Sequence, residues 1–95
     1  MPTLHIEHPI TDLATWTAAF DAFAAVRREA GVLAEQVRHP VGDPAFVVVD
    51  LEFAEVEQAE AFRGFLEANV WAVPANSPAL AGRPEATILV TVERS

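Results

Sequence analysis

The stretch Ala45–Phe53 limits the possible folds more than any other part of the sequence. Its β-branched and aromatic residues are typical of a strand, and successive side chains of a strand point to opposite faces. One face is wholly apolar and must pack on a core: Val47, Val49, Leu51 and Phe53. The other face carries two carboxylates beside two large apolar groups: Phe46, Val48, Asp50 and Glu52. We therefore expect any function to be associated with this second face.

Three more segments alternate in the same way and predict strands at residues 3–8, 32–39 and 87–93. In the last of these, we expect the apolar set to face the core and the rest to face outward, with Ile88, Val90 and Val92 inside. The weaker pattern of residues 32–39 leaves open which of its faces packs on the helices.

Two apolar stripes with helical spacing lie between these strands. The first stripe, Leu13, Trp16, Phe20 and Phe23, predicts one helix that Thr11 or Asp12 caps and Gly31 ends. The charged residues of this segment, Arg27 among them, lie mostly off the stripe. The second stripe predicts a helix over residues 55–71, which Pro74 ends. Ser77-Pro78 then predicts a short helical turn with proline in its first position, closed by Gly82.

The resulting order is β-α-β-β-α-β, without repeats or linkers, and we expect residues 1–95 to form a single domain. The usual arrangement of this order is the ferredoxin-like α+β fold, a four-stranded antiparallel sheet with both helices on one face. The first and third strands would then be central neighbours.

Composition excludes several classes of function. The net charge is −8 and all six basic residues are arginine, so binding to nucleic acid or to an anionic membrane is not expected. The chain has no cysteine, which excludes disulfides and thiolate metal sites. The sequence shows neither a signal peptide nor an apolar run of the ~20 residues that span a membrane, so we expect a cytoplasmic protein.

The second sheet face is too apolar to remain in water, because Phe46, Val48 and Leu89 accompany its polar residues. We expect either a ligand or a second copy of the chain to cover it, and we predict a homodimer through this open face.

At this level the chain resembles the dimeric α+β barrel superfamily, in particular small antibiotic biosynthesis monooxygenase-like proteins. The resemblance rests on the strand order and on three segments: Asp12–Trp16 with Phe20-Asp21, Gln58–Phe62 and Trp71–Leu80. It implies that two subunits pack their open sheet faces into a barrel. Members include cofactor-free monooxygenases, haem-degrading enzymes, isomerases and cyclases.

The haem-degrading branch does not fit these residues. Its pattern has an asparagine on the first strand and an axial histidine near the end of the second helix. This chain has His5 and Glu7 on the first strand and no histidine after His39. We therefore predict no cofactor.

Five residues are candidates for a site on the open face. His5 and Asp50 could act as a catalytic base held near neutral pKa inside the barrel, with Glu7 on the same side. Arg38 could orient an anionic substrate and Trp71 could form the wall of a pocket.

Plainer interpretations stand beside these. The histidine could belong to a solvated or dimer-interface sheet face, and Trp71 could be a hydrophobic lid at a helix end. A metal site of His5, Glu7 and Asp50 fits only in ligand type. His8 has the opposite parity and is expected to be a strand-end residue, and Ser77 to be a helix cap.

Two functions of different classes follow. The first is a cofactor-independent monooxygenase-like or cyclase-like enzyme acting on a small aromatic or polyketide-like molecule. The alternative is a non-catalytic dimeric module that binds a small ligand or has a structural role only. A cavity lined by His5, Asp50 and Trp71 would favour an enzyme or a binding module, and a barrel filled with side chains would favour the structural role.

Overall fold

The computed structural model describes residues 1–94 and has the predicted α+β order. The strands are β1 (Thr3–Pro9), β2 (Ala34–Arg38), β3 (Phe46–Glu52) and β4 (Glu85–Leu89). The helices are α1 (Leu13–Ala22), α2 (Ala24–Glu29) and α3 (Val56–Asn69), and a 3₁₀ turn spans Pro74–Asn76. All strand pairs are antiparallel, in the order β2-β3-β1-β4, so β1 and β3 are the central neighbours.

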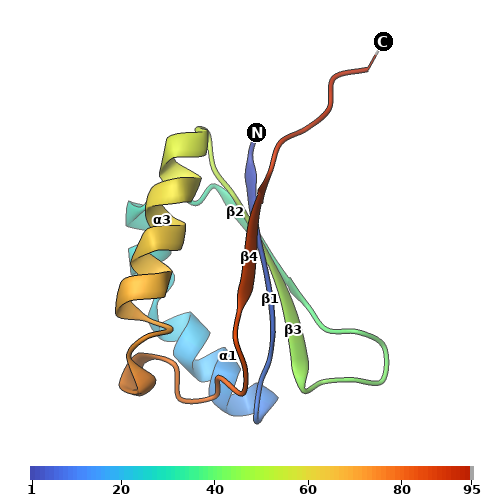
Figure 1. Cartoon of the computed structure of the whole chain (residues 1–95), viewed down its shortest axis with the longest axis vertical. Coiled ribbons are helices and arrows are strands. Elements are labelled where there is room, and N and C mark those ends of the chain that lie inside the picture. Colours follow the sequence, from blue (N-terminus) through green and yellow to red (C-terminus); the bar gives the residue numbers. More distant parts are fainter. Residues whose placement is uncertain (95) are drawn as a thin grey trace.

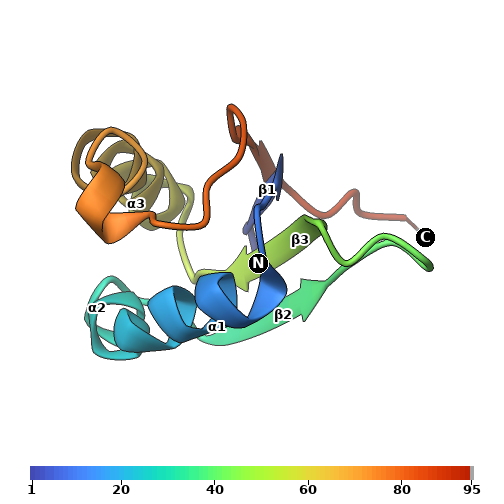
Figure 2. The ribbon, with the colours of Figure 1, turned by 90° about the horizontal axis from the view of Figure 1, so that it is seen from below.

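The helices cover one face of the sheet and leave the other open, as predicted for the ferredoxin-like fold (Figure 1). Figure 2 shows α1 and α2 on the β2 side of the sheet and α3 on the other side of the helical layer. The interior between the sheet and the helices therefore contains both the core and any space that the helices leave unfilled.

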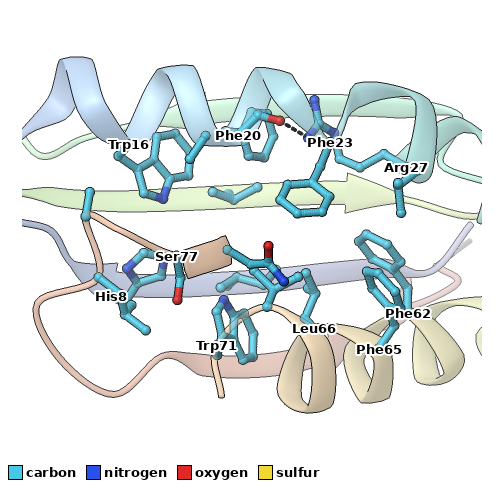
Figure 3. Close-up of a pocket in the computed structure, with 18 of the residues that line it drawn as sticks. His8, Trp16, Phe20, Phe23, Arg27, Phe62, Phe65, Leu66, Trp71 and Ser77 are labelled. Atoms are coloured by element: carbon cyan, nitrogen blue, oxygen red, sulfur yellow. Dashed lines mark hydrogen bonds between the residues drawn. The ribbon is translucent and has the colours of Figure 1, made fainter. Parts of the chain in front are cut away.

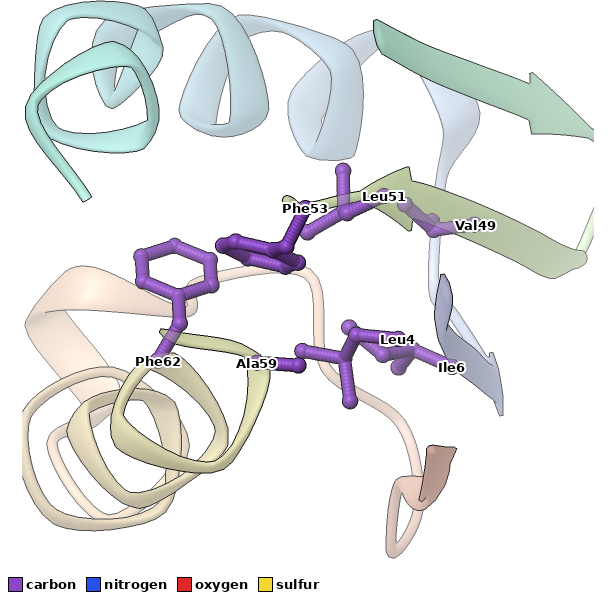
Figure 4. Close-up of a cluster of buried hydrophobic side chains, with 7 residues drawn as sticks. All are labelled: Leu4, Ile6, Val49, Leu51, Phe53, Ala59 and Phe62. Atoms are coloured by element: carbon purple, nitrogen blue, oxygen red, sulfur yellow. The ribbon is translucent and has the colours of Figure 1, made fainter. Parts of the chain in front are cut away.

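The core forms on the apolar face of the central strands, as the alternation predicts. Val47, Leu51 and Phe53 are at most 1% exposed. Strands β1 and β3 place their apolar side chains against α3, where Ala59 and Phe62 complete the cluster (Figure 4). Each such burial contributes about 1.5–3 kcal/mol of transfer free energy, so this cluster fixes the register of both central strands.

The first helical segment is not one helix but two. Phe23 separates α1 from α2 with φ −97° and ψ 13°, and its N–H bonds back to the carbonyls of Phe20 and Asp21. Arg27, expected off the apolar stripe, is instead 4% exposed and donates to the Phe20 carbonyl. The break turns the α2 side chains relative to α1, which is why the stripe did not predict the burial of Arg27.

Two other boundaries differ from the predictions. Strand β4 ends at Leu89, and Val90 and Val92 are 65% and 74% exposed, so their predicted inward orientation is wrong. The helical turn begins at Pro74 rather than at Ser77, because the earlier proline already provides a first position. Ser77 caps the other end of that turn and its hydroxyl donates to the Val73 carbonyl at 3.3 Å.

The register of β2 decides which of its faces packs on the helices. Glu35 pairs with Leu51 and Val37 with Val49, so these two residues share the helix side with the core. Gln36 and Arg38 lie on the open face, where Gln36 is opposite Asp50.

No helix within residues 1–94 is long and apolar enough to cross a membrane. The predicted cytoplasmic location stays a prediction.

Candidate functional site

Four of the five predicted site residues meet on the open face of the sheet. His5 on β1 is opposite Asp50 on β3, and its Nδ1 lies 2.6 Å from a carboxylate oxygen of Asp50. Its Nε2 lies 3.1 Å from Glu7, which has the same parity on β1. The Arg38 guanidinium donates to the second Asp50 oxygen at 2.6 Å. These four residues form one charged network.

This network suits a charged histidine better than a base. The hydrogen bond to Asp50 raises the pKa of His5, and the contact with Glu7 raises it further against the opposing effect of burial. A protonated imidazole donates from both nitrogens and has no lone pair for a substrate proton. Each partner of His5 is a carboxylate, so the observed geometry stabilises the imidazolium.

The same residues do not converge on a point where an ion could sit. His5 directs one nitrogen to each carboxylate, and within the described part of the chain no three histidine or acidic side chains are placed to hold a metal ion.

The structure places Trp71 on the opposite side of the sheet, away from His5 and Asp50. It follows α3 and lines a cavity between the helices and the inner sheet face. The predicted grouping of His5, Asp50 and Trp71 in one site is therefore wrong. Parity on the strands could not locate Trp71, because the loop after α3 folds under the helices rather than over the sheet edge.

The cavity is largely aromatic (Figure 3). It has a volume of about 80 Å³, about half of the roughly 150 Å³ of an engineered apolar cavity that binds benzene. A single-ring ligand would therefore have to displace side chains of the wall. Its walls come from β1, β3, all three helices and the loop that follows α3, and include Trp16, Phe20, Phe23, Phe62, Phe65 and Trp71. Trp16 stacks on Phe20 with centroids 4.8 Å apart.

His8 is a buried titratable group in this cavity, and the sequence interpretation did not select it. The side chain is 4% exposed, and its Nδ1 lies 3.0 Å from the Pro9 carbonyl oxygen. A carbonyl only accepts hydrogen bonds, so Nδ1 carries the proton and Nε2 has a free lone pair. Burial lowers the pKa of His8, which keeps the ring neutral near pH 7.

Two features of the sequence point to His8 in retrospect. It shares parity with the core residues Leu4 and Ile6, so β1 directs it inward. A histidine at the inner end of an apolar strand face is a candidate because neutral imidazole is a base that tolerates burial better than a carboxylate does.

Arg27 and two polar loop residues complete the cavity wall. Arg27 forms a two-point ion pair with Glu35 on β2. Asn76 donates to the Asn69 carbonyl at 2.7 Å, and Ser77 to Val73, so both side chains hold the loop in place. Among the described residues of the wall, His8 and Arg27 are the ionisable ones.

Comparison with known proteins identifies the fold of the chain. No protein-family model matches the sequence, and a search of curated proteins finds no match. Solved structures do match over nearly the whole chain. An antibiotic biosynthesis monooxygenase superposes with a TM-score of 0.70 at 14% identity, covering 98% of this chain and 100% of that one.

Two further structures are similar. The monooxygenase from the gene ActVA-Orf6 of Streptomyces coelicolor, in complex with nanaomycin D, gives a TM-score of 0.63 at 16% identity, over 99% of this chain and 89% of that one. A dimeric ferredoxin-like protein from an uncultured marine organism gives a TM-score of 0.66 at 16% identity, covering 99% of this chain and 96% of that one. The chain thus has the ferredoxin-like fold of antibiotic biosynthesis monooxygenase-like proteins.

Proposed function

We propose that this chain is a cofactor-independent monooxygenase-like or cyclase-like enzyme acting on a small phenol in the aromatic cavity, with His8 as general base. One observation carries the proposal: a buried, neutral histidine has its Nδ1 bound to the Pro9 carbonyl, which leaves the Nε2 lone pair for a ligand. The predicted base therefore moves from His5, which is held in a charged network, to His8.

The chemistry of a monooxygenase fits this arrangement. His8 Nε2 would accept the phenolic proton, and the electron-rich phenolate would reduce dioxygen without help from another group. One oxygen atom then enters the ring to give a quinone and the other leaves as water, so phenol plus O₂ gives quinone plus H₂O. An apolar cavity excludes water, so the charges that a proton transfer creates interact more strongly there than in bulk solvent.

The structural comparisons support this class of reaction by analogy. A protein of the same fold is described as a monooxygenase in complex with the ligand nanaomycin D. At 16% identity this likeness supports the fold of the present chain, and the assignment of chemistry rests on the cavity.

The test replaces His8 and measures both binding and turnover. With a panel of phenols and naphthols, oxygen consumption should fall by about 10²–10⁴-fold in His8→Gln, the usual contribution of a general base. The control is His39→Gln: His39 makes the same contact with its following proline, Nδ1 to the Pro40 carbonyl at 2.8 Å, but is exposed at the hairpin.

Equal turnover in the two variants would contradict the role of His8. Phenol binding without any oxygen consumption or product in the wild type would favour the alternative function, a small-ligand-binding module, over the enzyme.

We also propose that the protein is a homodimer through its open sheet face. Phe46 and Val48 are half-buried there and Leu89 is 46% exposed, which leaves an apolar surface beside the His5 network. A protein of similar fold is described as a dimer.

A further inference from the structure

We infer that Arg27 determines specificity in this cavity by binding an uncharged oxygen acceptor, such as a ketone or quinone carbonyl, at the end of the substrate away from its phenolic hydroxyl. The inference rests on the proposed function, because it concerns a ligand in the same cavity. It adds a substrate class: a phenol with a carbonyl at the opposite end of the ring.

Arg27 is placed in the cavity wall by the break between α1 and α2. Its guanidinium lies 3.6 Å from the centre of the Phe20 ring and donates to the Phe20 carbonyl. Phe20 in turn stacks on Trp16, so the arginine ends a row of planar groups along the cavity. Its side chain is 5% exposed, and an arginine is rarely buried to this degree unless its charge is paired, as it is here with Glu35.

The guanidinium has hydrogen-bonding capacity to spare. It carries five N–H groups, and the structure shows three bonds: Nε and Nη2 to Glu35 and Nη1 to Phe20. One N–H on each Nη is thus without a protein acceptor among residues 1–94. A ligand oxygen in the cavity would provide that acceptor.

The charge of the surroundings indicates which kind of oxygen. Glu35 lies 2.6 Å and 3.2 Å from two of the guanidinium nitrogens and neutralises the positive charge. A ligand carboxylate would have to compete with Glu35, whereas a carbonyl oxygen accepts from the spare N–H groups without disturbing the pair. The neutral pair therefore favours a neutral acceptor.

The positions of the two ionisable residues set the shape of the ligand. Figure 3 shows His8 on the strand side of the cavity, while the Arg27 guanidinium lies on the helix side, over the Phe20 ring. A ligand that contacts both would therefore carry its hydroxyl toward β1 and its carbonyl toward the helices, as a ring with the two groups at opposite ends does.

The experiment compares two phenols of nearly the same shape, 4-hydroxyacetophenone and 4-ethylphenol, which differ in one carbonyl oxygen. Titration calorimetry should show the wild type binding the ketone about tenfold more tightly, because one hydrogen bond to a charged group contributes this much. In Arg27→Met the ratio of the two dissociation constants should fall to about one. A merely structural role would weaken both phenols and leave their ratio unchanged.

Glu35→Gln provides a second test that does not remove the buried arginine. It leaves the guanidinium with net positive charge, so affinity for 4-hydroxybenzoate should rise at least about tenfold over the wild type, while affinity for 4-ethylphenol stays the same.

The outcomes separate the two proposals. If both phenols bind the wild type with equal affinity, or Arg27→Met keeps the ketone preference, or Glu35→Gln gains nothing for 4-hydroxybenzoate, the role of Arg27 is overturned. If neither phenol binds the wild type, the proposed function fails and the inference fails with it.

Discussion

At the scale of single residues, the two histidines of β1 are opposites. His5 lies between carboxylates on the open face, and these raise its pKa, whereas burial lowers the pKa of His8 on the inner face. The two residues are three positions apart, so the alternation of one strand separates a charged imidazole from a neutral one.

The opposite shifts predict opposite effects of pH on stability. His5 contributes stability that is fully present below its unfolded pKa of about 6.5 and is lost as pH rises through the higher folded pKa. His8 contributes stability that is present above about 6.5 and is lost as pH falls toward its lower folded pKa. We expect urea unfolding between about pH 5 and 8 to show that His8→Gln removes the loss on the acid side and His5→Gln the loss on the alkaline side. Identical pH profiles for the two variants would contradict the assignment.

At the scale of secondary-structure elements, the loop after α3 is held against the end of β1. The N–H of Ala81 bonds to the Pro9 carbonyl, and Ile10 bridges to Leu80. A Cβ added at Gly82 would lie 2.6 Å from Cγ of Pro9, the residue whose carbonyl orients His8. Gly82 is thus required for the close approach of the loop to β1, rather than for the end of a helical turn as the sequence suggests.

Gly82→Ala should therefore displace Pro9 and destabilise the protein by about 1–3 kcal/mol. We expect phenol binding to weaken as well, because His8 moves with Pro9. Gly64→Ala is the matched control: it lies on α3 with open space around its Cβ position, and should stabilise the helix by about 0.5–1 kcal/mol. Chemical denaturation of both variants measures the difference, and a stabilised Gly82→Ala protein would contradict this account.

The elements also show what the sequence could and could not predict. Alternation predicted the strands and the buried face of β3, because period-two patterning on a half-buried sheet has one solution. The central position of β3 followed from the order of the elements. Alternation did not show that β4 stops at Leu89, since Val90 and Val92 continue the same pattern without a partner strand. The position of Trp71 depends on the path of a loop, which no periodicity describes.

The candidate site was harder to predict than the fold for a similar reason. His5, Glu7 and Asp50 could be brought together from parity and strand order, whereas the position of Arg38 depends on the register of β2, which its weak pattern left open. The cavity could not be predicted, because the bend at Phe23 brings Arg27 inward and because the packing of helices on the sheet leaves space that depends on side-chain volumes.

At the scale of the whole molecule, the sheet has a helical layer on one face only, and the charged network and the apolar groups share the uncovered face (Figures 1 and 2). A second copy of the chain on this face would bury the charged network and the apolar groups together. Buried charges need oppositely charged partners, and each charged group of the His5 network has one. The cavity lies between the helices and the other face of the sheet, so dimer formation and ligand binding would use different faces.

The last prediction concerns this interface. Phe46→Glu places a charge in a contact that the dimer removes from water, at a cost of several kcal/mol, so light scattering at micromolar concentration should show a dimer for the wild type and a monomer for the variant. Phe46 is half-exposed in the single chain, and the variant should therefore keep its fold and its phenol binding. Val41→Glu is the control, because Val41 is fully exposed at the tip of the hairpin and a charge there should leave the dimer intact. A wild-type protein that is monomeric under these conditions, or a Phe46→Glu protein that remains a dimer, would rule out assembly through this face.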